Sequence, residues 1–233
     1  MIDLAPVRLG VAISMLGGAA VLDLRTRRVP NRYWFPFVAI AGALLLAEFA
    51  WTLPVDRRET IVYDAMAIGL VAFFYLVWRL RLFGGADAKA LMVLAVLEPR
   101  PVVGGLPVPP ALGTLALASI AGALVPVVFL LWNAGHGRFR LPAAFLAVPM
   151  ELGRARNAKV WPIQEVDAAG RVRFRYWVKL GGGLDERMAA RYAALEQAGV
   201  TTVWVTPKLP FFVPLLVGAL TWVWVGTLPL PQR

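Results

Sequence analysis

Long apolar runs, separated by short polar turns, dominate the chain. A helix that crosses a bilayer core of about 30 Å needs roughly 20 mostly apolar residues. One run, residues 86–97, is too short to cross alone, and we expect it to continue irregularly through the Pro- and Gly-containing stretch 99–110, shielded by protein. The pattern predicts an α-helical polytopic membrane protein with about six transmembrane helices, at residues 5–23, 33–53, 61–80, 86–97, 110–132 and 209–228.

Residues 133–208 interrupt this pattern with shorter segments of mixed character. Residues 160–165 and 172–178 flank the turn at 167–170, and the second segment alternates apolar and polar positions, which predicts a β-hairpin. The apolar side of its second strand carries Val172, Phe174 and Tyr176, and the arginines between them face the other way.

An amphipathic helix is expected next, over residues 184–198 with Gly199 at its end, followed by a strand at 200–205. One stripe of this helix is apolar, which is more typical of ordinary packing than of a binding surface; it holds Leu184, Met188, Tyr192 and Leu195. The sequence therefore predicts a small cytoplasmic α+β insertion between helices 5 and 6. The expected domains are residues 1–132 with helices 1–5, residues 133–208 with the insertion, and residues 209–233 with helix 6.

Composition supports a bilayer protein and removes several kinds of chemistry. Hydrophobic residues make up 59% of the 233 positions and charged residues only 16%, whereas a soluble domain carries about 25% charged residues. The first run ends in small residues like those of a signal-peptide cleavage site, but the aspartate and arginines that follow favour a retained helix. The chain has no cysteine, which excludes disulfides and thiol chemistry. His136 is the only histidine, and we expect no metal and no cofactor.

Basic residues set the expected orientation. The formal net charge is +10, and residues 133–208 hold 12 Lys or Arg against 6 Asp or Glu. With six crossings and the amino terminus outside, the inner side receives 7 further basic residues and the outer side 5, in agreement with the positive-inside rule. We therefore expect a multi-pass cell-membrane protein whose basic residues contact anionic lipids rather than nucleic acid.

Four acids lie within or against the apolar runs, and an ionisable group there is a functional candidate by default. Asp64 starts the third run outside and is separated from the inner face at Arg79 by about 22 Å of helix. Asp23 ends the first run and Asp87 begins the fourth, so both are expected near the cytoplasmic side, away from Asp64 and Glu48. By depth, Asp23 and Asp87 are the pair that can meet.

Two carboxyls at close range do not easily both ionise, so one keeps a proton and the pair can divide general-base and general-acid work around an attacking water. This predicts aspartyl-protease chemistry, which requires neither a metal nor a nucleophilic side chain. The alternative is structural: Asp23 pairs with Arg25 or Arg27, and Asp87 pairs with Lys89 or caps its helix.

The surroundings of both aspartates resemble the GxGD-type membrane aspartyl peptidases, specifically the archaeal preflagellin and type IV prepilin peptidases. Asp23-Leu24-Arg25-Thr26-Arg27-Arg28-Val29-Pro30-Asn31 is similar to the first motif of that family, and Phe83-Gly84-Gly85-Ala86-Asp87-Ala88-Lys89 is similar to the second. Ala86 stands where the pattern has its second glycine.

The resemblance implies that Asp23 and Asp87 are catalytic, with motif support or substrate binding from Gly84, Gly85, Ala86, Pro30, Asn31 and Lys208. For Gly84 and Gly85, close packing is favoured over substrate contact because glycine lets backbones approach. Lys208 enters the last helix in Lys208-Leu209-Pro210-Phe211, which also resembles the archaeal members and favours a structural role.

The implied activity is removal of short basic class III signal peptides from archaellin or type IV pilin precursors at the cytoplasmic membrane face. The absence of the cysteines that form a zinc site in bacterial relatives means that no methyltransferase activity is carried over. The resemblance leaves open which precursor is preferred, the role of residues 133–208 and the oligomeric state.

Two other classes of function fit parts of the sequence. A small ion-coupled transporter would use Asp23, Asp64 and Asp87 as relay groups, because intramembrane carboxylates also mark proton pathways. It would require the outer carboxylate, whereas a peptidase would not. A non-catalytic assembly factor would bind a cytoplasmic partner through the basic insertion and would not require Asp23 or Asp87.

Overall fold

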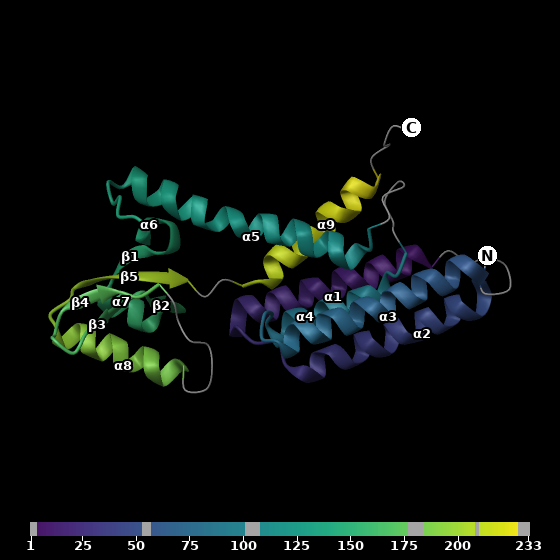
Figure 1. Cartoon of the computed structure of the whole chain (residues 1–233), viewed down its shortest axis with the longest axis horizontal. Coiled ribbons are helices and arrows are strands. Elements are labelled where there is room, and N and C mark those ends of the chain that lie inside the picture. The colour runs from purple at the N-terminus through teal and green to yellow at the C-terminus, as the bar shows by residue number, and fades with distance from the viewer. Residues whose placement is uncertain (1–3, 53–56, 101–107, 177–183, 208–209, 228–233) are drawn as a thin grey trace. The chain divides into compact units, whose positions relative to one another are not determined.

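All six predicted apolar runs form helices in the computed structural model, which describes residues 4–52, 57–100, 108–176, 184–207 and 210–227 (Figure 1). The helices are α1 (Ala5–Thr26), α2 (Trp34–Thr52), α3 (Arg57–Arg79), α4 (Gly85–Leu97), α5 (Pro110–Gly135) and α9 (Phe212–Thr227). A short 3-10 helix, η1 (Asn31–Tyr33), precedes α2. The expected continuation of the fourth run falls largely on residues 101–107, outside the described part of the chain.

Four helices within the described residues are long and apolar enough to cross a membrane, namely α1, η1 with α2, α3 and α5. With 13 residues, α4 is shorter than a bilayer crossing requires, and α9 has 16. The chain is therefore a mostly helical membrane protein with at least four candidate spans in its described residues, and the count of six remains a prediction.

The contacts divide the chain into two compact units, residues 1–122 with 210–233 and residues 123–209. In the first unit, α2 and α3 pack against α4, and α1 packs against α9 and α4. Figure 1 shows α1 to α4 lying lengthwise beside one another. An apolar helix without a polar face belongs in the interior, and α4 buries seven side chains: Ala88, Ala90, Leu91, Val93, Leu94, Ala95 and Leu97.

The second unit begins with the end of α5 and contains a three-stranded antiparallel sheet of order β1-β5-β2. Its strands are β1 (Val148–Glu151), β2 (Val160–Pro162) and β5 (Thr202–Pro207). The helices α7 (Leu152–Asn157) and α8 (Leu184–Gln197) contact the strands. Met188, Tyr192 and Leu195 of the predicted stripe are buried, as expected for packing, while the side chain of Leu184 lies outside the described residues.

The end of α5 is attached to a short helix, α6 (Ala143–Leu146), by one buried amide. Asn133 Nδ2 donates to the Ala144 carbonyl oxygen at 3.0 Å and to the Ala147 carbonyl oxygen at 2.8 Å. The sequence analysis did not predict α6, α7, β1 or η1, because segments of three to six residues are too short to show a periodicity.

The predicted strand 160–165 is wrong in one respect, because it is divided between two sheets. β2 pairs with β5, whereas β3 (Gln164–Val166) pairs with β4 (Val172–Phe174) in a separate two-stranded sheet. The change of partner occurs at Ile163, whose N–H donates to the Trp204 carbonyl oxygen of β5 at 2.9 Å while its own carbonyl oxygen accepts the N–H of Arg175, just after β4, at 2.7 Å. The last strand lies at 202–207 instead of 200–205, after Gly199 takes a φ of +72°.

The predicted turn at 167–170 closes the β3–β4 hairpin. The Asp167 carboxylate accepts the backbone N–H groups of Ala169 and Arg171, each at 2.9 Å, and the Arg171 N–H in particular lowers the pKa of Asp167. Phe174 and Tyr176 stack against each other on the apolar side, whereas Val172 remains 39% exposed.

In the first unit, α5 and α9 approach closely where α9 has a glycine. A Cβ on Gly218 would lie 2.5 Å from the carbonyl oxygen of Thr114 and 2.8 Å from the backbone nitrogen of Ala118. Small residues permit this backbone contact in membrane helices.

We therefore expect Gly218→Ala to destabilise the protein by about 1–3 kcal/mol, because the backbone of α5 cannot move aside as a side-chain tip can. Gly122→Ala on α5 is the matched control: its Cβ would enter open space, and alanine favours a helix by about 1 kcal/mol. Thermal unfolding in detergent measures both variants. Equal midpoints would show that α5 and α9 do not pack in this way.

Candidate active site

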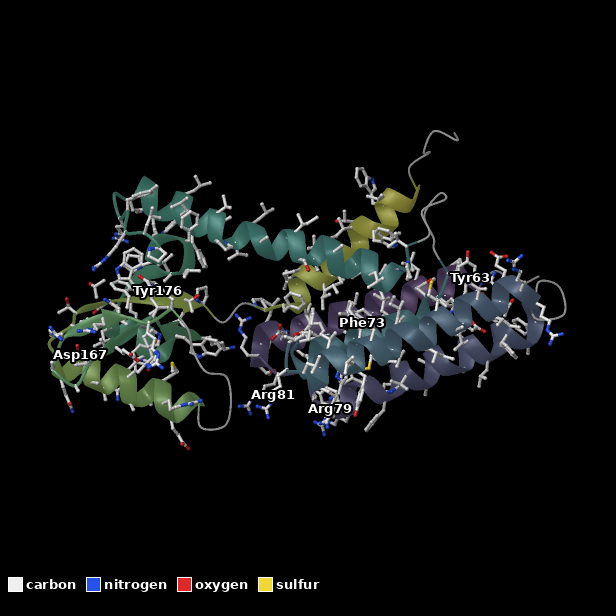
Figure 2. The ribbon with its side chains drawn as sticks, viewed as in Figure 1. Tyr63, Phe73, Arg79, Arg81, Asp167 and Tyr176 are labelled. Carbon is white, nitrogen blue, oxygen red and sulfur yellow. The ribbon has the colours of Figure 1, made fainter. Side chains whose placement is uncertain are left out.

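The aspartates singled out in the sequence lie at one end of the helical unit. Figure 2 shows Tyr63 towards one end of α3 and Arg79 at the other, with Arg81 just beyond it. The chain reverses after Arg79 and enters α4, so Asp87 lies in the first turn of α4 at the Arg79 end. Asp23 lies in the last turn of α1, where its carbonyl oxygen accepts the N–H of Arg27 at 2.9 Å.

Asp23 and Asp87 are brought within electrostatic range of each other, since the charge of Asp23 acts on Asp87. Both side chains are half-buried. Their helices pack in one apolar core and run in opposite directions, because the start of α1 bonds to the end of α4 through Arg8 and Leu97. This arrangement brings the aspartates of both motifs to the same end of the unit.

The remaining two acids belong to an ion cluster at the opposite end of the unit. Glu48 forms ion pairs with Arg8 and, at 2.8 Å, with Arg100. Asp64 lies within electrostatic range of Glu48 and of both arginines. Arg8 is only 4% exposed and also donates to backbone carbonyls of α2 and α4, at Leu44 and Leu97. These contacts give Glu48 and Asp64 a structural environment away from Asp23 and Asp87.

Asp23 faces the beginning of α9. Its Oδ2 accepts the backbone N–H of Phe212, the first residue of that helix, at 3.5 Å. A helix start carries a partial positive charge, which favours a carboxylate. Aromatic contacts hold α9 there, with Phe212 against Trp34 at 5.9 Å and Phe211 against Phe83 at 6.3 Å between ring centroids.

The sequence analysis did not predict the contact with Phe212. It singled out the adjoining segment that begins at Lys208, but a backbone donor has no side-chain signature. Lys208 itself lies outside the described residues.

The two glycines before Asp87 make room for different neighbours. A Cβ on Gly84 would lie 2.5 Å from Oδ2 of Asp87. A Cβ on Gly85 would lie 3.1 Å from Nε1 of Trp78, on the last turn of α3. Ala86, which replaces the glycine of the resembled pattern, is half-buried and packs against the core of the unit. The glycine positions thus set the space around the Asp87 carboxyl and the α3–α4 reversal.

The turn after Asp23 is fastened to both α1 and α4. Pro30 leads into η1, and the hydroxyl of Tyr33 donates to the carbonyl oxygen of Met15 on α1 at 2.7 Å. Lys89 Nζ donates to Oδ1 of Asn31 at 2.6 Å. The hydrogen bond of Tyr33 to Met15 and that of Lys89 to Asn31 were not predicted, because each joins segments that are distant in the sequence.

An open hollow of about 690 Å³ lies at the same end of the unit, between the turn after α1 and the start of α4, and its lining does not include Asp23 or Asp87. Leu22 and Ala86, the residues that directly precede Asp23 and Asp87, are both part of its wall. The remaining lining residues are Thr26, Arg28, Val29, Pro30, Asn31 and Arg32. The hollow is large enough to admit several residues of an extended peptide.

Two neighbouring carboxyls can share one proton and so act as base and acid on the same water. Among the described residues, no group of three or more His, Asp or Glu could hold a metal ion.

Comparison with protein families agrees with the motifs. The model of the type IV leader peptidase family matches residues 10–127, just over half of the chain, and this range includes both aspartates. A second model, the archaeal peptidase A24 C-terminus type II, matches residues 140–228. Among curated proteins, no sequence matches this chain. The chain therefore belongs to the type IV leader peptidase family, in the branch of the archaeal preflagellin and prepilin peptidases.

Proposed function

We propose that this leader peptidase is an aspartyl endopeptidase in which Asp23 and Asp87 form the catalytic pair. The family acts on pilin and archaellin precursors as a protease. The observation that carries the proposal is the approach of one carboxyl from each family-like motif, on α1 and α4, at the same end of the helical unit.

In the proposed reaction the pair shares one proton. The ionised carboxyl removes a proton from a water molecule, whose oxygen attacks the scissile peptide carbonyl and gives a tetrahedral intermediate. The other carboxyl hydrogen-bonds the developing oxyanion. A proton then passes to the amide nitrogen as the C–N bond breaks, which releases a carboxylic acid on the leader and an amine on the mature protein. Charge near Asp23 is stabilised by the N–H of Phe212.

The substrate we propose is a class III signal peptide, a short basic leader joined to an apolar helix, cleaved at the cytoplasmic face. In this topology the amino terminus lies outside, α4 and α9 complete six membrane segments, and residues 133–208 lie in the cytoplasm. Because Arg28 and Arg32 line the hollow at this end of the unit, we place the basic residues of the leader outside it, at anionic lipid headgroups.

The transporter alternative receives less support, because Asp64, the outer relay group that it requires, has a different environment from Asp23 and Asp87. Asp64 lies beside the ion cluster that joins Glu48 to Arg8 and Arg100. We therefore place Asp64 with this cluster, apart from Asp23 and Asp87, where a peptidase does not require it.

We expect Asp23→Asn and Asp87→Asn each to lower cleavage of a class III precursor by at least about a hundredfold, because each removes a proton-transfer group. Asp64→Asn is the matched control and should cleave within a few-fold of the wild type. Membranes containing each variant are incubated with the precursor, and the mature product is quantified.

Inserted, folded protein is verified for each variant by its elution in detergent. Normal cleavage by folded Asp23→Asn or Asp87→Asn would contradict the proposal. Loss of function in Asp64→Asn as well would favour the transporter.

Gly84→Ala tests the position of the Asp87 carboxyl without removing it. The added methyl would occupy space 2.5 Å from Oδ2, so the carboxyl must move from its present position. Misplacement by about 1 Å costs as much as a hundredfold in rate, and we expect a 10- to 100-fold lower kcat. Gly17→Ala on α1, whose Cβ meets open space, serves as the control. A fully active Gly84→Ala enzyme would show that this orientation of Asp87 is not the working one.

A further inference from the structure

A bond between two side chains joins the segments that carry the aspartates. Lys89 Nζ donates to Oδ1 of Asn31 at 2.6 Å, across 58 residues of sequence. Lys89 follows Asp87 by two positions on α4, and Asn31 begins η1 after the turn that leaves Asp23. A hydrogen bond from an ammonium group is among the stronger and more directional kinds in proteins.

Lys89 is held in place from a third side. Its ammonium lies 5.6 Å from the centroid of the Trp78 ring, at the end of α3, in a cation–π arrangement. Trp78 is itself fixed by Tyr75, edge-on at 5.6 Å, and by the close approach of Gly85. The end of α3, the start of α4 and the turn after α1 therefore meet at one amino group.

The turn that carries Asn31 has little freedom of its own. Arg27 adopts a left-handed conformation with φ of +57°, and Thr26 Oγ1 donates to the Arg28 carbonyl oxygen at 2.8 Å. Further along, Tyr33 is bonded to Met15 of α1. Because the turn is fixed to α1 in this way, a displacement of Asn31 also displaces the end of α1, where Asp23 lies.

From these contacts we propose that Lys89 is a positioning residue, which through Asn31 holds the end of α1 against the start of α4 and so sets the separation of Asp23 and Asp87. The inference rests on the proposed catalytic role of these aspartates. It gives Lys89 a task distinct from pairing with Asp87, and it gives Asn31 a task distinct from binding the substrate.

A substrate-binding role is the main rival. Asn31 and Lys89 also line an apolar hollow of about 550 Å³ that extends along α2, α3 and α4 past Val38, Val71 and Val96. If the pair contacted substrate bound there, its loss would raise KM. A loss of positioning leaves the substrate contacts in place and lowers kcat.

The test compares kcat and KM for precursor cleavage by Lys89→Met, Asn31→Ala and the double variant. We expect each single variant to lower kcat about 10- to 100-fold with KM within about twofold of the wild type. The double variant should be no slower than the slower single variant, because both changes break the same bond. Lys89→Arg and Asn31→Asp, which keep a donor and an acceptor, should retain most of the activity.

Arg79→Met is the matched control, because it removes an exposed cation at the same end of the unit and should cleave normally. A raised KM with unchanged kcat, effects that multiply in the double variant, or normal cleavage by both single variants would each overturn the inference. Asp23→Asn and Asp87→Asn are assayed in parallel. If these two are inactive while Lys89→Met and Asn31→Ala are active, only the positioning role fails; if these two are active, the catalytic proposal fails.

Discussion

The burial of α4 governs the arrangement of the helical unit. This 13-residue helix has apolar residues around its whole circumference, and α1, α2 and α3 pack against it. In a membrane the gain comes from close packing, because lipid tails are as apolar as the side chains, and small residues such as Ala88, Ala90 and Ala95 allow helices to approach. Asp87, in the first turn of this helix, is therefore half-buried within the unit.

Polar contacts at the two ends of α4 complement this packing. At its end, the Leu97 carbonyl accepts a bond from Arg8 near the start of α1. Near its start, Lys89 bonds to Asn31 after the end of α1. Two antiparallel helices joined at both ends cannot slide freely along each other. At the far end Glu48 forms ion pairs with Arg8 and Arg100, whereas Asp23 and Asp87 share the near end, and this difference separates Glu48 from the proposed catalytic carboxyls.

The helix α9 shows how a segment distant in sequence contributes to the same end. Gly218 allows α9 to approach the backbone of α5, and α1 packs along α9. The start of α9 then offers the N–H of Phe212 to Asp23. The proposed site thus combines α1, α4 and α9, and the family models that match residues 10–127 and 140–228 cover all three helices.

The sequence alone determined the membrane class, the six apolar helices, the family and the two candidate aspartates, because long apolar runs and short motifs are local signals. It also predicted α8 and the turn at 167–170, whose periodicity and turn residues are equally local. The tertiary structure decided that residues 160–166 serve two sheets, since Ile163 bonds to β5 through its N–H and to Arg175 through its carbonyl oxygen, and strand partners are chosen across the fold. It also decided which partners Asp23, Lys89 and Glu48 have. Those partners lie on other segments of the chain. The sequence around a residue does not show which amide N–H or side-chain acceptor packing will bring near it.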